Sequence, residues 1–207
     1  MQLKVEDFHE LARSRSESAV RRHLVESAEI KRQIAQQCLD SILESANLMA
    51  DALRSGGKVL LCGNGGSAAD CQHMAGEFVN WLNKDFQRPG LAAIALTADS
   101  SIMTAIANDS GFDSIFERQV QALGKAGDVL LGISTSGNSP NVIRAVKAAR
   151  EIGMRTISLT GAGGNLAAIA DVTVAVPSTN TQYIQEAHLA VEHILCELVE
   201  SYLFDKD

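Results

Sequence analysis

The spacing of apolar residues predicts that the first quarter of the chain is helical. Over residues 27–54 apolar side chains return every three or four positions, which places them on one face of a helix. Gly56 and Gly57 follow, and glycine is typical of the position just after a helix end. A shorter helix is expected from about Val5 to Arg13. Residues 1–55 are therefore predicted to form an N-terminal helical segment.

After Gly57 the pattern changes to short, nearly continuous apolar runs that alternate with stretches of helical periodicity. Such runs are typical of strands in a parallel sheet that is covered on both faces. The predicted strands are 58–63, 91–97, 128–134, 155–161 and 171–176. The predicted helices are 68–82, 101–107, 114–123, 141–152, 166–170 and 182–204. The sequence therefore predicts one α/β domain over residues 1–207, a doubly wound five-stranded parallel sheet flanked by helices.

Composition and charge narrow the class of protein. Of the 207 residues 46% are apolar, which indicates a folded core, and 4% are aromatic, too few for base-stacking modules. The net charge of −7 argues against nucleic acid or an anionic membrane surface as the partner. We find no signal-peptide pattern and no apolar run near the roughly 18 residues of a membrane span, so we expect a cytoplasmic protein. Free thiols are expected for Cys38, Cys62, Cys71 and Cys196.

The loop "STSGNSPN", residues 134–141, is a candidate phosphate site, and we call it the serine loop. In a doubly wound sheet, ligands bind outside the carboxyl ends of the strands, and this loop follows the third predicted strand. Pro140 suits the first turn of a helix, so Ser139 is the expected N-cap residue. Hydroxyl groups and a positive helix end favour a phosphate, which Gly137 lets approach closely; the alternative is a plain capping loop. The hydroxyl-bearing residues are Ser134, Thr135, Ser136 and Ser139.

The loop "GNGGSAAD", residues 63–70, follows the first predicted strand, and we call it the glycine loop. It has two interpretations. Its glycines and Ala68 fit the loose dinucleotide-binding pattern G-x-G-x-x-G/A. That pattern needs an acidic residue about 20 positions later, and Asp99 lies well beyond that spacing. We therefore prefer a sugar-phosphate site, in which Asn64 and Ser67 contact the sugar or the phosphate.

Two helices carry candidate metal or proton-transfer residues. His73 and Glu77 are four residues apart, so they lie on one face of the helix after the glycine loop. They could hold a metal or exchange a proton, although such a pair in isolation is more often a surface hydrogen bond. In the last helix, Gln185 precedes His188 by three residues and His193 by eight, or about 12 Å along the axis. Local spacing favours His188, and His193 could join Gln185 on one metal only if the two side chains lean together.

Several further polar positions are ambiguous. Asn108 and Asp109, after the second predicted strand, could bond sugar hydroxyls or could simply end a helix. Thr97 and Asp99 have a similar ambiguity, and Asp99 is a plausible helix N-cap residue. The histidines of the N-terminal segment, His9 and His23, are interpreted as surface residues.

Five segments together resemble the sugar isomerase (SIS) family and, more closely, the bacterial phosphoheptose isomerases. They are "GGKVLLCGNGGSAADCQHMAGEF", "RPGLAAIALTADSS", "AIANDSGF", "GDVLLGISTSGNSPNVI" and "IQEAHLAVEH". The similarity runs from about residue 43 to the C-terminus. The match to the family is thinnest over the first 42 residues. The resemblance implies isomerisation of sedoheptulose 7-phosphate to D-glycero-D-manno-heptose 7-phosphate, at the entry to heptose for lipopolysaccharide.

The resemblance also implies a homotetramer with active sites at subunit contacts, and one zinc ion per subunit. The implied zinc ligands are His73, Glu77, Gln185 and His193. Here the family indicates His193 where local spacing favours His188, and we follow the family. The implied substrate contacts are Asn64, Gly65, Gly66, Asn108, Asp109, Ser134, Thr135, Ser136, Ser139 and Gln185.

The chemistry of the reaction suits these residue types. Aldose–ketose isomerisation moves a proton between C1 and C2 through a cis-enediol, and one base on one face of the sugar can do this. Glu77 is the candidate base. Burial would raise its pKa toward neutrality, whereas a nearby zinc would lower it. His193 is the candidate acid that moves a proton between the two oxygens, and zinc could polarise the carbonyl.

Three other functions fit parts of the sequence. A related group of SIS proteins binds the bacterial replication initiator without catalysis. A sugar-phosphate sensor would keep the serine loop and would need neither Glu77 nor His193. An isomerase of the same fold could act on another ketose phosphate. The presence of both Glu77 and His193 favours an enzyme.

Overall fold

The computed structural model describes residues 5–204, with the backbone alone for residues 5–12, so that the side chain of His9 lies outside the described residues. Its five strands form one parallel sheet in the order β2-β1-β3-β4-β5. They are β1 (Val59–Gly63), β2 (Ala93–Ala95), β3 (Val129–Ser134), β4 (Arg155–Thr160) and β5 (Val172–Ala175). The predicted doubly wound five-stranded parallel sheet is confirmed.

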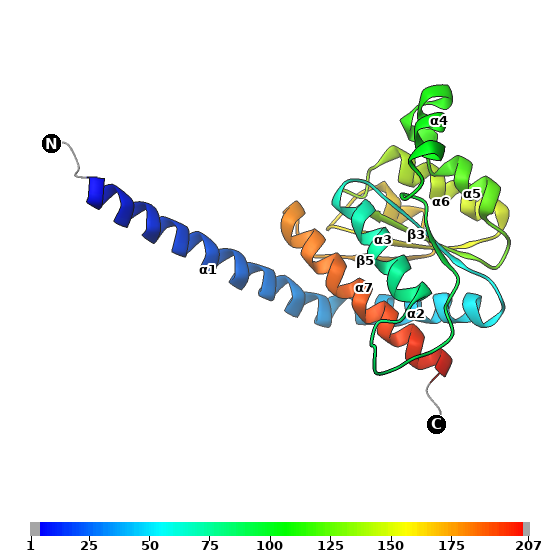
Figure 1. Cartoon of the computed structure of the whole chain (residues 1–207), viewed down its shortest axis with the longest axis horizontal. Coiled ribbons are helices and arrows are strands. Elements are labelled where there is room, and N and C mark those ends of the chain that lie inside the picture. Colours follow the sequence, from blue (N-terminus) through cyan, green and yellow to red (C-terminus); the bar gives the residue numbers. More distant parts are fainter. Residues whose placement is uncertain (1–4, 205–207) are drawn as a thin grey trace.

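Helices cover both faces of the sheet (Figure 1). Along β1 the side chains alternate: Val59 and Leu61 pack with α2, α3 and α7, whereas Leu60 and Cys62 pack with α5 and α6. Both faces are therefore buried, which explains the unbroken apolar runs of the strands. The helices are α1 (Val5–Gln37), α2 (Leu39–Arg54), α3 (Gly66–Val79), α4 (Ser100–Ser110), α5 (Glu117–Leu123), α6 (Pro140–Ile152) and α7 (Thr181–Phe204), with short 3-10 helices η1 (Phe112–Ser114) and η2 (Asn165–Ala168).

The strand order places a topological switch point between β1 and β3. Strand β2 is the neighbour of β1 toward one edge of the sheet, and β3 is its neighbour toward the other edge. The chain therefore runs outward from β1 to β2 and then returns past β1 to β3. The loops that leave the two strands consequently diverge and open a crevice at their carboxyl ends, where doubly wound proteins bind ligands. The glycine loop leaves β1 and the serine loop leaves β3, so the topology brings together the two loops that the sequence singles out.

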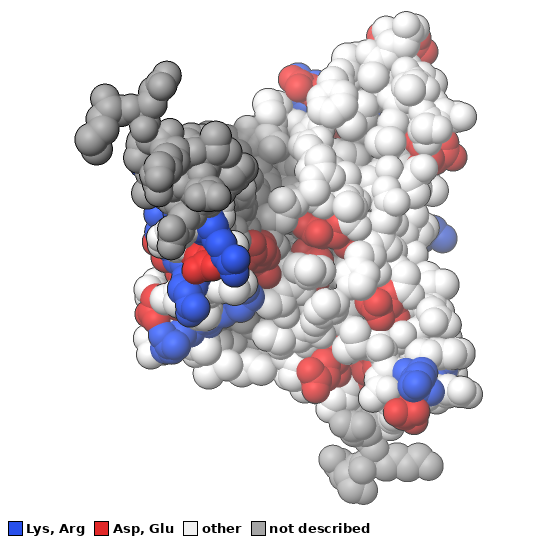
Figure 2. Space-filling model, turned by 60° about the vertical axis from the view of Figure 1, so that its left-hand side comes forward, with Lys and Arg blue, Asp and Glu red and all other residues white. Residues whose placement is uncertain are grey.

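The N-terminal helices differ from the prediction in their boundaries. One helix, α1, runs through residues 14–26, where the sequence lacks a regular apolar stripe but also lacks glycine and proline. The break falls instead at Cys38, between α1 and α2. Helix α1 projects away from the body of the molecule (Figure 1). On the face shown in Figure 2, Lys and Arg side chains gather on α1, whereas the body carries scattered Asp and Glu.

Three smaller differences concern the sheet and its connections. The predicted strand 91–97 shortens to the edge strand β2, and the predicted helix 166–170 is the single 3-10 turn η2. Helix α3 begins two residues earlier than predicted and ends at Val79 rather than residue 82. All four cysteines are free, as expected, and the structure buries each of them.

Candidate active site

Two asparagine side chains bridge the switch point. Asn64, just after β1, and Asn141, in the first turn of α6, exchange two hydrogen bonds: Nδ2 of Asn64 lies 2.9 Å from Oδ1 of Asn141, and the reverse bond is 2.8 Å. Asn141 is 2% exposed, and its Oδ1 also accepts from the N–H of Val142. The paired amides fix the distance between the two loops. Sequence reasoning did not select Asn141, although it is the last residue of the quoted serine loop.

The glycine loop lets a side chain of α7 lie on the first turn of α3. Gly65 has φ of +58°, a conformation that favours glycine, and Gly66 begins the helix. The amide of Gln185 covers Gly66 so closely that a β-carbon there would lie 1.7 Å from Nε2 of Gln185. The same Nε2 lies 3.5 Å from Oδ2 of Asp70, whose pKa is raised by burial. Ser67, in the same turn, is buried.

Adding a methyl group at Gly66 is expected to impair the site without unfolding the chain. In Gly66→Ala the clash is with the flexible end of Gln185, so Gln185 moves and the backbone stays. We expect the KM for the substrate to rise at least tenfold while the midpoint of urea unfolding changes little. Gly76→Ala, on the same helix, is the matched control, because a β-carbon there meets nothing within 4 Å. Equal kinetics of the two variants would contradict a role for Gln185 over Gly66.

The serine loop is preformed. Ser139 is the N-cap residue of α6 and Pro140 is its first residue, as predicted, but the hydroxyl of Ser139 pairs with that of Ser134 at 2.9 Å and caps no backbone N–H. Gly137 has φ of +65°, and a β-carbon there would lie 2.3 Å from the carbonyl oxygen of Gly163. The loop borders a cavity of about 340 Å³ whose lining includes Thr135, Ser136, Asn138, Gly164, Ser178 and Thr181.

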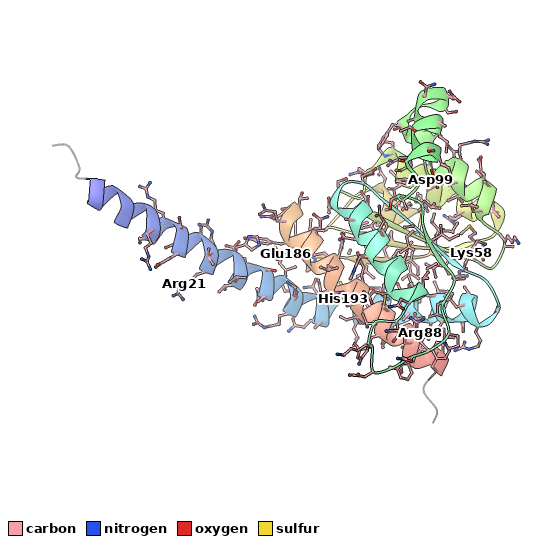
Figure 3. All side chains as sticks on the ribbon, in the orientation of Figure 1. Arg21, Lys58, Arg88, Asp99, Glu186 and His193 are labelled. Carbon is pink, nitrogen blue, oxygen red and sulfur yellow. The ribbon has the colours of Figure 1, made fainter. Side chains whose placement is uncertain are left out.

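Helices α3 and α7 bring the predicted proton-transfer and metal residues together. Nε2 of His73 lies 2.8 Å from Nε2 of His193, and the two rings meet edge to face with centroids 5.0 Å apart. Glu77 follows His73 by one turn of α3, and its Oε1 lies 3.7 Å from Nδ1 of His73. Figure 3 labels His193 on α7, where this helix passes α3. Three residues that the sequence separates by up to 120 positions thus form one cluster.

This cluster fits part of a zinc site. Two imidazole nitrogens that converge on one point, with a carboxylate nearby, are donors that zinc prefers. Glu77, however, contacts Nδ1 of His73 rather than the point where the Nε2 atoms meet, and the amide of Gln185 lies over Gly66. Among the described side chains, those of residues 13–204, no three His, Cys, Asp or Glu are placed to hold one metal ion. The four predicted ligands therefore need side-chain rotations of Glu77 and Gln185 before they can share a metal.

His188, the ligand that local spacing favours, turns into the core instead. It is fully buried, with Nε2 3.1 Å from the carbonyl oxygen of Thr160, while its Nδ1 has no hydrogen-bond partner among the described residues. Glu192, one turn later, is also buried, and both its carboxyl oxygens lack a described partner. Burial raises the pKa of Glu192 to about 8 and lowers the pKa of His188 to about 4. His188 is therefore a core residue in this structure, whereas His193 contacts His73.

The buried imidazole of His188 is expected to make the fold sensitive to acid. Its pKa is about 4 in the folded chain against an ordinary 6.5, so the unfolded chain binds the proton first as pH falls. The unfolding free energy should therefore decline between pH 6.5 and 4, by about 3 kcal/mol from this group. His188→Gln, which can still donate to Thr160, should lack that part of the decline in urea titrations at several pH values. Parallel pH profiles for the two proteins would contradict this account.

Asn108 and Asp109 lie apart from this cluster. They occupy the last turn of α4, are exposed, and bond each other, with Nδ2 of Asn108 2.8 Å from Oδ1 of Asp109. No described contact joins them to the glycine loop, the serine loop or α7. Asp99 is the N-cap residue of α4, as expected, and accepts from the N–H of Ile102 at 2.9 Å.

A buried ion pair secures the far end of α3, just past Glu77. Nη2 of Arg88 lies 2.6 Å from Oε1 of Glu200 on α7, and both side chains are almost fully buried. The same Arg88 donates to the carbonyl oxygens of Glu77, at 2.9 Å, and Phe78, at 2.8 Å. Since these are C-terminal carbonyls of α3 that lack helical partners, Arg88 completes the helix end and fixes it against α7. Sequence reasoning did not find this pair.

Comparison with known proteins agrees with the fold. A family model described as SIS domain matches residues 23–161. The phosphoheptose isomerase of Nitratidesulfovibrio vulgaris (strain Miyazaki F) is 52% identical over 184 residues, 88% of each chain, and that of Aquifex aeolicus is 53% identical over 182 residues, 87% of this chain and 94% of the relative. The solved phosphoheptose isomerase of Neisseria gonorrhoeae matches with a TM-score of 0.84 and 47% identity, covering 89% of this chain and 98% of that one. The described helices include none that is long and apolar enough to cross a membrane.

The doubly wound sheet, with its two loops at the switch point and the matching family model, makes this chain a SIS-domain protein. At about half its positions it is identical to relatives over nearly their whole length. The chain belongs to the phosphoheptose isomerase family.

Proposed function

We propose that the chain converts sedoheptulose 7-phosphate to D-glycero-D-manno-heptose 7-phosphate by proton transfer between C1 and C2. The observation that carries this proposal is the cluster of Glu77, His73 and His193, which α3 and α7 hold beside the glycine loop. In an enediol mechanism a carboxylate can transfer the proton between the carbons, and an imidazole on the facing helix can move a proton between the oxygens. A cytoplasmic location and a place in lipopolysaccharide heptose synthesis belong to the same proposal.

In this proposal each residue has a stated task. Glu77 takes the proton from C1 and returns it to C2, and His193 moves a proton between the oxygens on these carbons. The hydroxyls of the serine loop and the start of α6 bind the phosphate at the far end of the sugar, which positions C1 and C2 at Glu77. Gln185 and Asn64 bond the hydroxyl groups between these two ends.

We include one zinc ion per subunit in the proposal, held by His73, His193 and Glu77, with Gln185 as a fourth ligand. Bound zinc would stabilise negative charge on the sugar oxygens at C1 and C2. The converging imidazoles support this assignment. The amide of Gln185 must leave its position over Gly66 to bind the zinc. Of the four proposed ligands, Gln185 is therefore the one that the arrangement of side chains supports least.

The proposed assembly is a homotetramer with active sites at subunit contacts. Exposed apolar side chains on the projecting helix α1, those of Val20, Leu24 and Val25, support an interface there. An apolar hollow of about 450 Å³ between α1, α2 and α7 supports it too. The position of Asn108 and Asp109 fits this arrangement, because they can contact a substrate only if another chain brings its site to α4.

The substrate is tested by comparing kcat/KM for sedoheptulose 7-phosphate with the values for five- and six-carbon ketose phosphates, with zinc supplied. We expect the seven-carbon substrate to be preferred by at least a hundredfold. A preference for a shorter ketose phosphate would overturn the substrate and keep the reaction. Saturable binding of all of them without turnover would replace the enzyme by a sensing or scaffolding protein.

A further inference from the structure

His23 of α1 lies beside the candidate active site rather than on the open surface. Its Nε2 lies 2.6 Å from Oε1 of Glu186, the residue after Gln185 on α7. Figure 3 labels Glu186 near the start of α7, at the end that lies beside α1. A cavity of about 340 Å³ lies next to His23. Its lining also includes Gln185, which covers Gly66, and Asp70, which Gln185 contacts. The cavity is lined by His23, Asp70, Gln182, Gln185, Glu186 and Leu189.

The contacts around His23 hold both the imidazole and the carboxylate in place. The hydroxyl of Ser27 donates to the second oxygen of Glu186 at 2.5 Å, and the ammonium of Lys31 donates to Ser27 at 2.7 Å. The ring of Tyr183 meets that of His23 edge to face, with centroids 4.8 Å apart. Both oxygens of Glu186 are thus engaged, and the imidazole is held by a carboxylate and by an aromatic ring. A solitary surface histidine would have neither.

This arrangement determines which ring nitrogen of His23 can react. A carboxylate only accepts hydrogen bonds, so the contact with Glu186 places a proton on Nε2 of His23. Nδ1 then carries the lone pair of the neutral ring and can take up or release a proton. No hydrogen bond to Nδ1 is found among the described residues, and 35% of the side chain is exposed. A histidine oriented by a carboxylate, with its other nitrogen accessible, is the usual form of a general acid–base residue.

We propose that His23 is a second proton-transfer residue of this active site and that it opens the cyclic form of the ketose phosphate. The inference rests on the proposed function. A ketoheptose phosphate closes into a hemiketal in which the ring oxygen is bonded to C2, whereas the enediol step needs a free carbonyl at C2. Opening is therefore a required step before Glu77 can act, and it needs a group that both accepts and donates a proton.

One imidazole can make both proton transfers of this step. Nδ1 of His23 takes the proton of the hydroxyl group on C2, and the electron pair of that O–H bond forms the C2 carbonyl. The bond from C2 to the ring oxygen breaks, and the ring oxygen receives the proton from Nδ1. Nothing is oxidised or reduced, and no other reactant is consumed. Asp70 and Gln185, in the same cavity, link this step to the glycine loop that Gln185 covers.

The test separates ring opening from isomerisation. Sedoheptulose 7-phosphate labelled with carbon-13 at C2 is mixed with the full-length, zinc-supplied Glu77→Gln protein, and exchange NMR measures the interconversion of its anomers. We expect this protein to accelerate the interconversion and the Glu77→Gln/His23→Gln protein to lose at least nine-tenths of the acceleration, since glutamine can still bond Glu186 but cannot pass on a proton. Calorimetric titration of the same proteins checks that both bind the sugar phosphate.

Each outcome decides the inference. Equal acceleration by the single and double variants, or no acceleration by a Glu77→Gln protein that binds the sugar, would overturn it even if the parent isomerises the substrate. Acceleration that depends on His23 in a parent protein that does not isomerise would leave ring opening and remove the proposed function. If His23→Gln does not fold, Glu77→Gln/Glu186→Gln replaces it: loss of acceleration is expected, and full retention would contradict the role of His23. Tyr183→Phe, which keeps the ring beside His23, is the matched control.

Discussion

Replacing Glu77 with glutamine is expected to lower kcat for isomerisation of sedoheptulose 7-phosphate at least a hundredfold. A neutral amide cannot take the proton from C1, and a positioned general base typically contributes 10²–10⁴-fold, about 3–5 kcal/mol of the barrier. Glutamine matches glutamate in size and helix propensity, so α3 should remain intact. KM should change by less than about fivefold, because the phosphate and hydroxyl contacts belong to other residues. Steady-state kinetics of the purified variant give both values.

Two further variants make this result specific. Glu197→Gln carries the same change on an exposed carboxylate one turn after His193 on α7, and it should leave kcat unchanged. His193→Ala should lose activity to a similar extent as Glu77→Gln. Because the two residues act on one proton-transfer sequence, the double variant should be little worse than either single variant. A Glu77→Gln protein that keeps a tenth or more of the parent kcat would remove Glu77 as the base.

Removing Arg88 is expected to cause a large loss of stability. In Arg88→Met the carboxylate of Glu200 stays buried without its partner, and breaking a buried ion pair from one side typically costs about 3–5 kcal/mol. The carbonyl of Glu77 loses the donor that Arg88 provides, whereas the carbonyl of Phe78 still accepts from the N–H of Leu91. Urea unfolding at fixed protein concentration measures the effect. Arg13→Met, which removes an exposed pair with Glu17, is the control and should change the free energy by less than about 1 kcal/mol.

The double variant Arg88→Met/Glu200→Leu distinguishes the stranded charge from lost packing. Because it buries no unpaired carboxylate, it should recover much of the stability that Arg88→Met loses. Its kcat should nevertheless stay below that of the parent, since the contacts of Arg88 with the end of α3 that carries Glu77 are then lost. A double variant as unstable as Arg88→Met would show that the backbone contacts of Arg88, and not the ion pair, dominate.

The sheet and its loops follow from local sequence features. Near-continuous apolar runs predict buried parallel strands, and hydroxyl- and glycine-rich stretches at their ends predict the serine and glycine loops. Helix boundaries were predicted less well where the sequence has no stop signal. Residues 14–26 lack apolar periodicity, yet they continue α1 because nothing in them opposes a helix. Cys38, where the helix breaks, has no feature that marks a break.

The site was predictable to the extent that its residues share an element or a motif. His73 and Glu77 follow from i, i+4 spacing, whereas the meeting of His73 with His193 depends on how α3 packs against α7. Local spacing selected His188, and only the resemblance to a family selected His193. The pairs that single-sequence reasoning missed, Asn64 with Asn141 and His23 with Glu186, join residues 77 and 163 positions apart. No periodicity reports contacts of that range.

We propose that this chain isomerises a seven-carbon ketose phosphate with Glu77 as the base. The most direct measurement incubates the purified, zinc-supplied protein with sedoheptulose 7-phosphate and follows the appearance of D-glycero-D-manno-heptose 7-phosphate by NMR, beside the Glu77→Gln variant. We expect steady turnover by the parent and at least a hundredfold less by the variant. Saturable binding of the sugar phosphate by the parent without formation of the aldose would contradict it.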